Sequence, residues 1–166
     1  MVKKIREVSP PRGLARLAWR APIWFYRLGL GGLLGERFLL INHIGRKSGK
    51  MRQAVVEVVC KDKDTGAFVV ASGFGEQADW YKNLMVNPEV AIQVGRKRMN
   101  ARAERLPAPQ AAEALLDYHH RHPTALQTLA KILGYQTDGS QEDILFLAKV
   151  IPMILLTCHQ NCAGKS

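Results

Sequence analysis

Residues 36–62, ERFLLINHIGRKSGKMRQAVVEVVCKD, consist of two apolar segments joined by a turn that contains two glycines. The segments ERFLLINHI (36–44) and QAVVEVVCKD (53–62) are rich in the apolar and β-branched residues that strands favour. Two such segments around a short glycine-containing turn are typical of a β-hairpin. The connection carries four cations: Arg46, Lys47, Lys50 and Arg52. The stretch therefore predicts two paired strands with a strongly basic connection.

Four further segments have the character of short strands. After a turn at 63–67, FVVAS (68–72) is expected to pair with the second strand of the hairpin. EVAIQVG (89–95) and RMNARAERL (98–106) alternate apolar and polar residues, which predicts a second hairpin that turns at Gly95 and Arg96. IPMILLTC (151–158) is expected to be the last strand. About six short strands with few helices between them predict a mainly β protein with flanking helices (α+β), built on a small antiparallel barrel.

Helical patterns surround these strands, at 12–30, 79–87, 107–123, 124–134 and 140–150. In the first of them, a spacing of 100° per residue separates two faces. One face carries Arg12, Arg16, Arg20 and Arg27, and the other carries Leu14, Leu17, Ala21, Trp24, Phe25 and Leu28. Pro22 is expected to restart this helix as a first-turn residue. The helix can pack on the barrel, or it can lie on anionic lipid with its arginines reaching the headgroups, and the sequence leaves both interpretations open.

The composition of the chain, with 166 residues of which 47% are apolar and 23% charged, is that of a soluble globular domain. We expect a loose basic tail at 1–11, one domain at 12–160 and a short tail at 161–166. No apolar run is long enough to cross a membrane, and arginines interrupt the N-terminal segment where a signal peptide would need an apolar core. A cytoplasmic location is therefore expected, with peripheral contact at the inner membrane face if the first helix binds lipid.

The net charge of +10 is concentrated in residues 1–52, which hold twelve Lys and Arg against Glu7 and Glu36. The remaining twelve cations are balanced by twelve acidic residues. A basic region on a neutral body indicates an anionic partner that meets this region, such as a phosphorylated ligand, a membrane surface or a nucleic acid.

The basic connection is the first candidate site. Its residues Arg46, Lys47, Ser48, Gly49 and Arg52 can offer guanidinium, ammonium, hydroxyl and backbone N–H groups to one phosphate. A solvated hairpin tip is the alternative, because exposed basic turns are common.

The second candidate site is ASGFGEQADWYKNL (71–84). Here a strand ends at Ala71 and Ser72, glycines allow close approach of the backbone, and a helix presents Trp80 and Asn83. A planar ring system would suit this edge, although Trp80 can equally be a core residue.

Other chemistry has weak support in the sequence. The histidines His119, His120 and His122 lack the spacing of a metal site, so no metal is expected. Cys158, His159 and Cys162 are expected to lie in a tail beyond the last strand. No arrangement of nucleophile and base stands out, so no catalytic side chain is assigned.

Together, FLLINHIGRKSGKMRQAVVEV and FVVASGFGEQADWYKNLMVNPEVAIQV resemble the deazaflavin-dependent nitroreductase and quinone reductase family of split β-barrel proteins. The resemblance implies a split β-barrel like that of FMN-binding proteins. It also implies the 8-hydroxy-5-deazaflavin coenzyme (F-420) as cofactor, with its phosphate-bearing tail at Arg46, Lys47, Ser48, Gly49 and Arg52. Ala71, Ser72, Trp80 and Asn83 match positions near the ring and tail.

The implied activity is an oxidoreductase reaction, in which the reduced coenzyme passes a hydride to a quinone-like or nitroaromatic acceptor. Two positions depart from the nitroreductase branch of the family. Gly73, which we include among the cofactor-binding residues, replaces a lysine, and Glu57 replaces a tyrosine on the substrate side. The alternatives are an FMN-dependent reductase of the same fold and a non-catalytic carrier of a flavin or deazaflavin. The resemblance also suggests a homodimer, and no nucleic-acid partner is expected.

Overall fold

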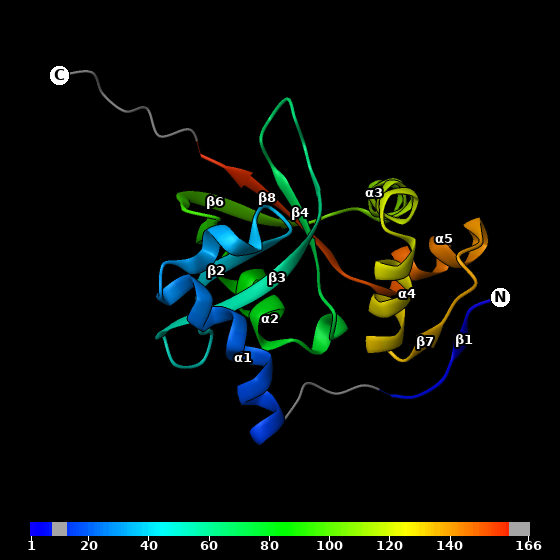
Figure 1. Ribbon diagram of the computed structural model, residues 1–166, viewed down its shortest axis with the longest axis horizontal. Helices are drawn as coiled ribbons and strands as arrows, with labels where there is room; N and C mark the ends of the chain where they lie inside the picture. Colours follow the sequence, from blue (N-terminus) through cyan, green and yellow to red (C-terminus); the bar gives the residue numbers. More distant parts are fainter. Residues whose placement is uncertain (8–12, 160–166) are drawn as a thin grey trace.

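Six antiparallel strands close into a barrel in the computed structural model, which describes residues 1–7 and 13–159 (Figure 1). The order of the strands around the barrel is β2-β3-β4-β8-β6-β5. Their bounds are Phe38–Ile44 (β2), Met51–Lys61 (β3), Phe68–Ala71 (β4), Glu89–Val94 (β5), Lys97–Arg105 (β6) and Met153–Cys158 (β8). The predicted fold, a mainly β split barrel with flanking helices, is confirmed.

The two predicted hairpins are present. Strands β2 and β3 pair from Phe38 opposite Glu57 to Ile44 opposite Met51. Strands β5 and β6 pair around the turn at Gly95. Cys158 ends β8 and lies opposite Ala101 of β6, as the expected last strand 151–158 requires, so its alternative position in a tail beyond that strand is wrong. The backbone N–H of His159 continues this pairing by donating to the carbonyl of Asn100 at 2.9 Å, whereas Cys162 lies outside the described residues.

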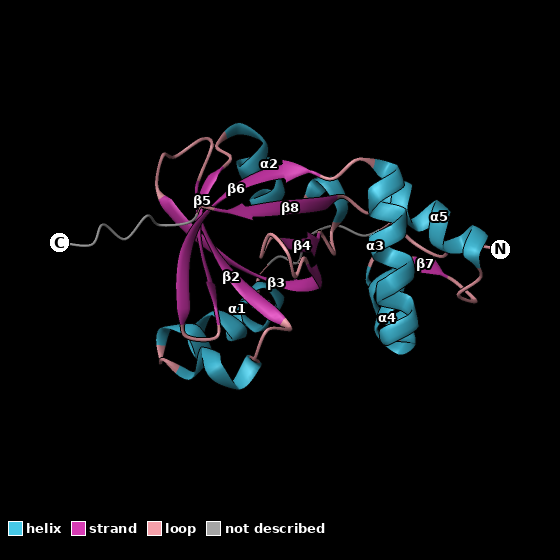
Figure 2. Cartoon of the chain, turned by 90° about the horizontal axis from the view of Figure 1, so that it is seen from above, coloured by secondary structure: helices cyan, strands magenta, loops and turns pink. Residues whose placement is uncertain are grey.

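The helices are α1 (Leu14–Arg27), α2 (Asp79–Val86), α3 (Ala108–Arg121), α4 (Pro123–Ile132) and α5 (Gln141–Val150). Two short 3-10 helices, η1 (Leu30–Leu34) and η2 (Gly75–Gln77), lie between them in the chain. Helices α3, α4 and α5 form a layer beside the barrel, as Figure 2 shows. Along the parts of the chain that the structure describes, no helix combines the length and apolar character that a membrane crossing requires.

The alternation of side chains in β4 explains how the barrel joins this layer. Phe68 and Val70 point into the barrel core, while Val69 and Ala71 contribute to a second core with the helices. All four residues are buried because both faces of the strand are covered. Helix α2 covers one end of the barrel, with Leu84 completely buried in the barrel core.

Helix α1 packs through a face different from the predicted one. Ile23 and Tyr26 are buried against Leu40 of β2, and the Tyr26 hydroxyl donates to the carbonyl of Phe38 at 2.8 Å. The helix is continuous through Pro22, so the expected restart at this residue is wrong. Among the side chains that the structure describes here, the large exposed apolar ones are Leu14, Trp24, Phe25 and Leu28. Arg12 and the side chains of Arg16, Leu17 and Arg20 lie outside the described part of the structure.

Lys3 and Lys4, which belong to the segment expected to be a loose tail, are paired with the helical layer. Strand β1 (Lys3–Lys4) pairs with β7 (Tyr135–Gln136). The N-terminal ammonium lies 3.2 Å from a carboxylate oxygen of Asp143, which is itself buried. This contact between oppositely charged groups keeps the start of the chain close to α5.

Candidate functional site

The β2–β3 connection and helix α2 meet at one end of the barrel through Arg46. The guanidinium Nη1 of Arg46 donates to Asn83 Oδ1 at 2.9 Å, and the Arg46 backbone N–H donates to the same oxygen at 3.1 Å. Its Nη2 forms an ion pair with Asp79 at 3.2 Å. Arg46 therefore fixes the basic connection to the helix, and most of its donors are occupied by protein groups.

His43 extends this network into the barrel. Asn83 Nδ2 lies 3.2 Å from His43 Nδ1. Because Asn83 Oδ1 accepts from Arg46, the amide nitrogen must donate to the ring, and His43 Nδ1 is an unprotonated acceptor. Burial lowers the pKa of His43 below its usual value, and the charge of Arg52 lowers it further, against smaller opposing effects of the Ile44 backbone and Asp79. His43 is thus a neutral imidazole in the folded protein at neutral pH.

The lowered pKa of His43 predicts a loss of stability in mild acid. An unfolded histidine titrates near pH 6.5, so below this pH the unfolded chain binds a proton that folded His43 does not bind. The free energy of unfolding should therefore be fully retained above pH 6.5 and should fall as the pH decreases below it. Urea unfolding at several pH values between 7 and about 5 measures this dependence. The free energy of unfolding should fall less steeply with decreasing pH for His43→Gln than for the unaltered protein. The exposed His120, replaced in the same way, is the control; an equal slope in both variants contradicts this assignment.

The remaining groups of the basic connection are exposed and close together. Gly49 has a φ of 63°, and its N–H donates to the carbonyl of Gly45 at 2.8 Å, which closes the turn. The Ser48 hydroxyl accepts from the Lys50 N–H at 3.3 Å. Within the described residues, no carboxylate forms an ion pair with Lys47, Lys50 or Arg52. These three cations are available to an anionic ligand, whereas Arg46 is largely not.

Residues 71–73 lie at the end of β4, between the barrel and α4. Ser72 is completely buried, and its hydroxyl donates to the carbonyl of Gly75 at 2.7 Å, so its side chain shapes the following loop. Ala71 is also buried. A Cβ atom on Gly73 would lie 3.8 Å from Leu129 and from Ile132, which is ordinary contact. The backbone at Gly73 therefore faces α4 without crowding.

Trp80 is partly buried and packs against the barrel core, as the alternative interpretation expects. Its ring meets that of Tyr81 edge-on, with 6.4 Å between the centroids. The structure thus brings Arg46 into direct contact with Asp79 and Asn83 of α2. Trp80 lies on the same helix as these two residues. Residues 71–73 come before the loop that leads into α2, so they lie at the opposite end of that loop.

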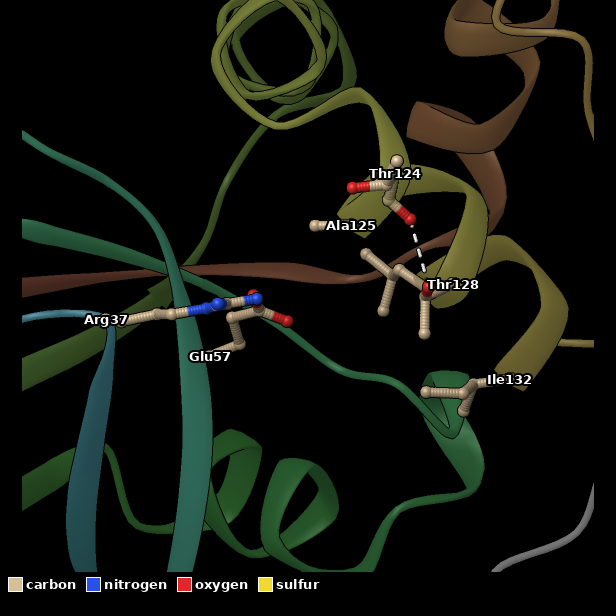
Figure 3. Close-up of a pocket in the computed structure, with 7 residues that line it drawn as sticks. Arg37, Glu57, Thr124, Ala125, Thr128 and Ile132 are labelled. Atoms are coloured by element: carbon tan, nitrogen blue, oxygen red, sulfur yellow. Dashed lines mark hydrogen bonds and ion pairs between the residues drawn. The ribbon is translucent and has the colours of Figure 1, made fainter. Parts of the chain in front are cut away.

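A cavity of about 180 Å³ lies between the barrel wall and α4 (Figure 3). Arg37 and Glu57 form one side, and Thr124, Ala125 and Thr128 lie opposite them. Leu129 and Ile132 also line the cavity, so it adjoins Gly73.

The carboxylate of Glu57 is held at the wall of this cavity. Its Oε1 accepts from the Tyr118 hydroxyl at 2.7 Å and forms an ion pair with Arg37 at 3.4 Å. Burial raises the pKa of Tyr118, and the hydrogen bond to Glu57 raises it further, so the hydroxyl keeps its proton. Of the residues around this carboxylate, the sequence indicated Glu57 alone. Arg37, Tyr118 and α4 come from distant segments and carry no local motif.

Comparisons with known proteins identify the relationship. A family model described as F420H(2)-dependent quinone reductase matches residues 20–129. One relative is a protein of Mycobacterium tuberculosis (strain ATCC 25618 / H37Rv) with the name "Putative F420H(2)-dependent quinone reductase Rv3178". It is 39% identical to the present chain over 79 residues. This match covers 46% of the present chain and 65% of that relative, so the chain spans less than two thirds of its length.

Solved structures share the fold at low identity. Protein Atu2129 of Agrobacterium tumefaciens str. C58, described as of unknown function, has a TM-score of 0.53 and 14% identity, with 92% of this chain and 58% of that chain covered. A structure described as a domain-swapped dimer has a TM-score of 0.50 and 20% identity, with coverages of 82% and 99%. The family match extends over more than half of the sequence and includes both the basic connection and residues 71–83. The chain therefore belongs to the F420H(2)-dependent quinone reductase family.

Proposed function

We propose that the protein binds the deazaflavin coenzyme F-420 and catalyses hydride transfer from its reduced form to a quinone-type acceptor. The observation that carries this proposal is the basic connection, which Arg46 and Asn83 fix beside α2 with Lys47, Lys50 and Arg52 lacking carboxylate partners in the described structure. A cluster of cations without carboxylate partners among the described residues suits the phosphate-bearing tail of the coenzyme. When bound, the reduced deazaflavin supplies the hydride.

In this proposal the polar end of the ligand lies at the start of β3 and the ring end lies near the middle of the strand. Lys47, Ser48, Gly49 and Arg52 receive the phosphate, and Arg46 acts as a brace for the connection. Arg52 and Glu57 are five residues apart on one strand, which corresponds to roughly 17 Å. An extended ligand can therefore reach from the connection to the cavity beside Gly73.

The cavity at Glu57 is the proposed acceptor site. Its volume of about 180 Å³ is the size of cavity that can hold a single ring, and Ala125, Leu129 and Ile132 provide apolar contact. Tyr118 and Arg37 bind the same oxygen of Glu57, Oε1. Because this arrangement fixes the carboxylate, Glu57 can accept a hydrogen bond from a hydroxyl group of the reduced quinone.

Titration with two cofactors tests the proposal. We expect F-420 fluorescence to change on binding, with an affinity at least tenfold higher than that for FMN. Tighter binding of FMN would support the FMN-dependent reductase instead, and no response from either cofactor would exclude every flavin-type function. Binding of reduced F-420 without oxidation by the quinone menadione would identify a non-catalytic carrier.

Peripheral membrane contact through α1 and η1 forms a second part of the proposal. Trp24, Leu28 and Leu33 are more than half exposed, and Arg27 lies beside Trp24 with 5.2 Å from its guanidinium carbon to the ring centroid. Exposed apolar groups next to cations favour anionic lipid surfaces. We expect the protein to sediment with anionic vesicles and Leu28→Glu combined with Leu33→Glu to remove most of this binding.

The control for this experiment replaces Val86 and Leu145, which are exposed apolar residues elsewhere on the surface. Changing both to glutamate adds the same charge at a distance from α1 and should leave vesicle binding nearly intact. Equal losses in the two double variants, or no binding by the unaltered protein, would refute a membrane-facing α1.

A homodimer is the third part of the proposal. Its support is the domain-swapped dimer among proteins of the same fold. Sedimentation equilibrium should give twice the chain mass of 18.5 kDa. A mass that stays at that of one chain up to high micromolar concentration would exclude the dimer.

A further inference from the structure

A second cavity, of about 400 Å³, lies at the other end of the barrel from the basic connection. Residues at the ends of several strands line it, including Lys61 of β3, Phe68 of β4, Val94 of β5 and Lys97 of β6. None of the residues proposed for the coenzyme or for the acceptor borders this cavity. It is therefore a separate feature of the fold, at the mouth of the barrel.

The floor of this cavity is apolar and deformable. Phe68 and Val94 belong to the buried barrel core, and Met99 and Cys158 are partly buried beside them. The sulfur atoms of Met99 and Cys158 lie 3.4 Å apart. Because thioether and thiol groups are polarizable and adapt to irregular shapes, this floor can pack against an apolar molecule.

The rim of the cavity carries positive charge that the protein does not neutralise. Lys61 is paired, since its ammonium lies 2.8 Å from Glu36 Oε1. Arg98 donates to the neutral amide oxygen of Gln93 at 3.1 Å. In the described part of the chain no carboxylate forms an ion pair with Lys97 or Arg98. His159 Nε2 lies 3.1 Å from Glu89 Oε2.

We propose that the barrel mouth binds a small organic anion with an apolar body, such as a carboxylate or a sulfonate. An inorganic anion would leave the apolar floor unused, and a neutral apolar molecule would leave Lys97 and Arg98 without a counter-charge. Only a ligand that combines both properties matches the floor and the rim together. The mouth of a barrel is also a frequent position for small-molecule sites.

Fluorescence titration of the full chain with anilinonaphthalene sulfonate tests this inference. We expect saturable binding at one site per chain, and binding at least tenfold weaker for the uncharged phenyl naphthylamine, which has nearly the same apolar body. Decanoate should displace the sulfonate, while inorganic phosphate at equal concentration should not. Displacement by phosphate with the potency of decanoate would overturn the role of the apolar floor.

Matched variants locate the site. Replacing Lys97 and Arg98 by glutamine should weaken binding about tenfold, the loss expected for one charge-assisted contact. Replacing Lys63 and Arg96 by glutamine removes the same charge from exposed turns at the same end of the barrel and should change affinity less than twofold. Met99→Trp should block the cavity, with folding checked by thermal unfolding. Equal affinities in the two double variants, or full binding by a folded Met99→Trp variant, would overturn the assignment.

Discussion

Replacing Lys47 and Arg52 together by alanine is expected to weaken F-420 binding by about 100-fold. Each residue offers a charge-assisted hydrogen bond to phosphate, and such bonds contribute about 1.5–3 kcal/mol each. The combined loss of about 3 kcal/mol corresponds to two orders of magnitude in the dissociation constant. Fluorescence titration at fixed ionic strength measures this change.

The matched control for this variant is Lys63→Ala combined with Arg96→Ala. Both side chains are exposed at the other end of the barrel, so this control removes equal charge without touching the basic connection. Its affinity for F-420 should stay within threefold of that of the unaltered protein. If the Lys47 and Arg52 variant stays within the same limit, the basic connection is a solvated turn and not a phosphate site.

Asn83→Ala is expected to lower the free energy of unfolding by about 2–3 kcal/mol. Asn83 is 5% exposed and bonds the Arg46 backbone, the Arg46 guanidinium and His43. Its removal leaves the ring nitrogen of a buried histidine without a partner, and it leaves Arg46 attached to α2 through Asp79 alone. An unsatisfied buried polar group costs about 1–3 kcal/mol, so this loss accounts for most of the expected effect.

Urea unfolding monitored by circular dichroism measures this stability change. Met85→Ala is the control on the same helix, because Met85 is 40% exposed and exposed substitutions usually change stability by less than about 0.5 kcal/mol. A loss below 1 kcal/mol for Asn83→Ala would contradict the central position given to this side chain.

The barrel itself could be predicted because its strands carry local signals. The segments around Gly45 and Gly49 and around Gly95 are close in sequence and alternate in a way that defines both hairpins. Closure of the barrel depends on β8, which pairs with β4 and β6 from far along the chain. The apolar run of β8 predicted a strand but not its neighbours, because pairing between distant strands leaves no local pattern.

The helix α1 shows where periodicity fails as a guide. Its apolar stripe suggested burial of Trp24, Phe25 and Leu28, yet the structure buries Ile23 and Tyr26 instead. The Tyr26 hydroxyl supplies a reason, since it reaches the carbonyl of Phe38 when this face packs on the barrel. A hydrogen bond to a distant strand cannot be deduced from a helical wheel.

The candidate site was only partly visible in the sequence for a similar reason. Residue types alone placed cations at the connection, but they could not show how the structure treats them. Arg46 is bound by Asp79 and Asn83, while Lys47, Lys50 and Arg52 have no carboxylate partner among the residues that the structure describes. The side of the acceptor cavity formed by Arg37, Tyr118 and α4 had no signal, because these residues meet Glu57 only in the folded chain.

Single-turnover oxidation of reduced F-420 is the most direct test of the proposed activity. The protein is loaded anaerobically with the reduced coenzyme and mixed with menadione, and the absorbance of the oxidised deazaflavin is followed with time. The proposed function predicts oxidation that is much faster than in protein-free solution and that slows at subsaturating coenzyme when Lys47 and Arg52 are replaced by alanine. Bound coenzyme that reacts no faster than free coenzyme would contradict it.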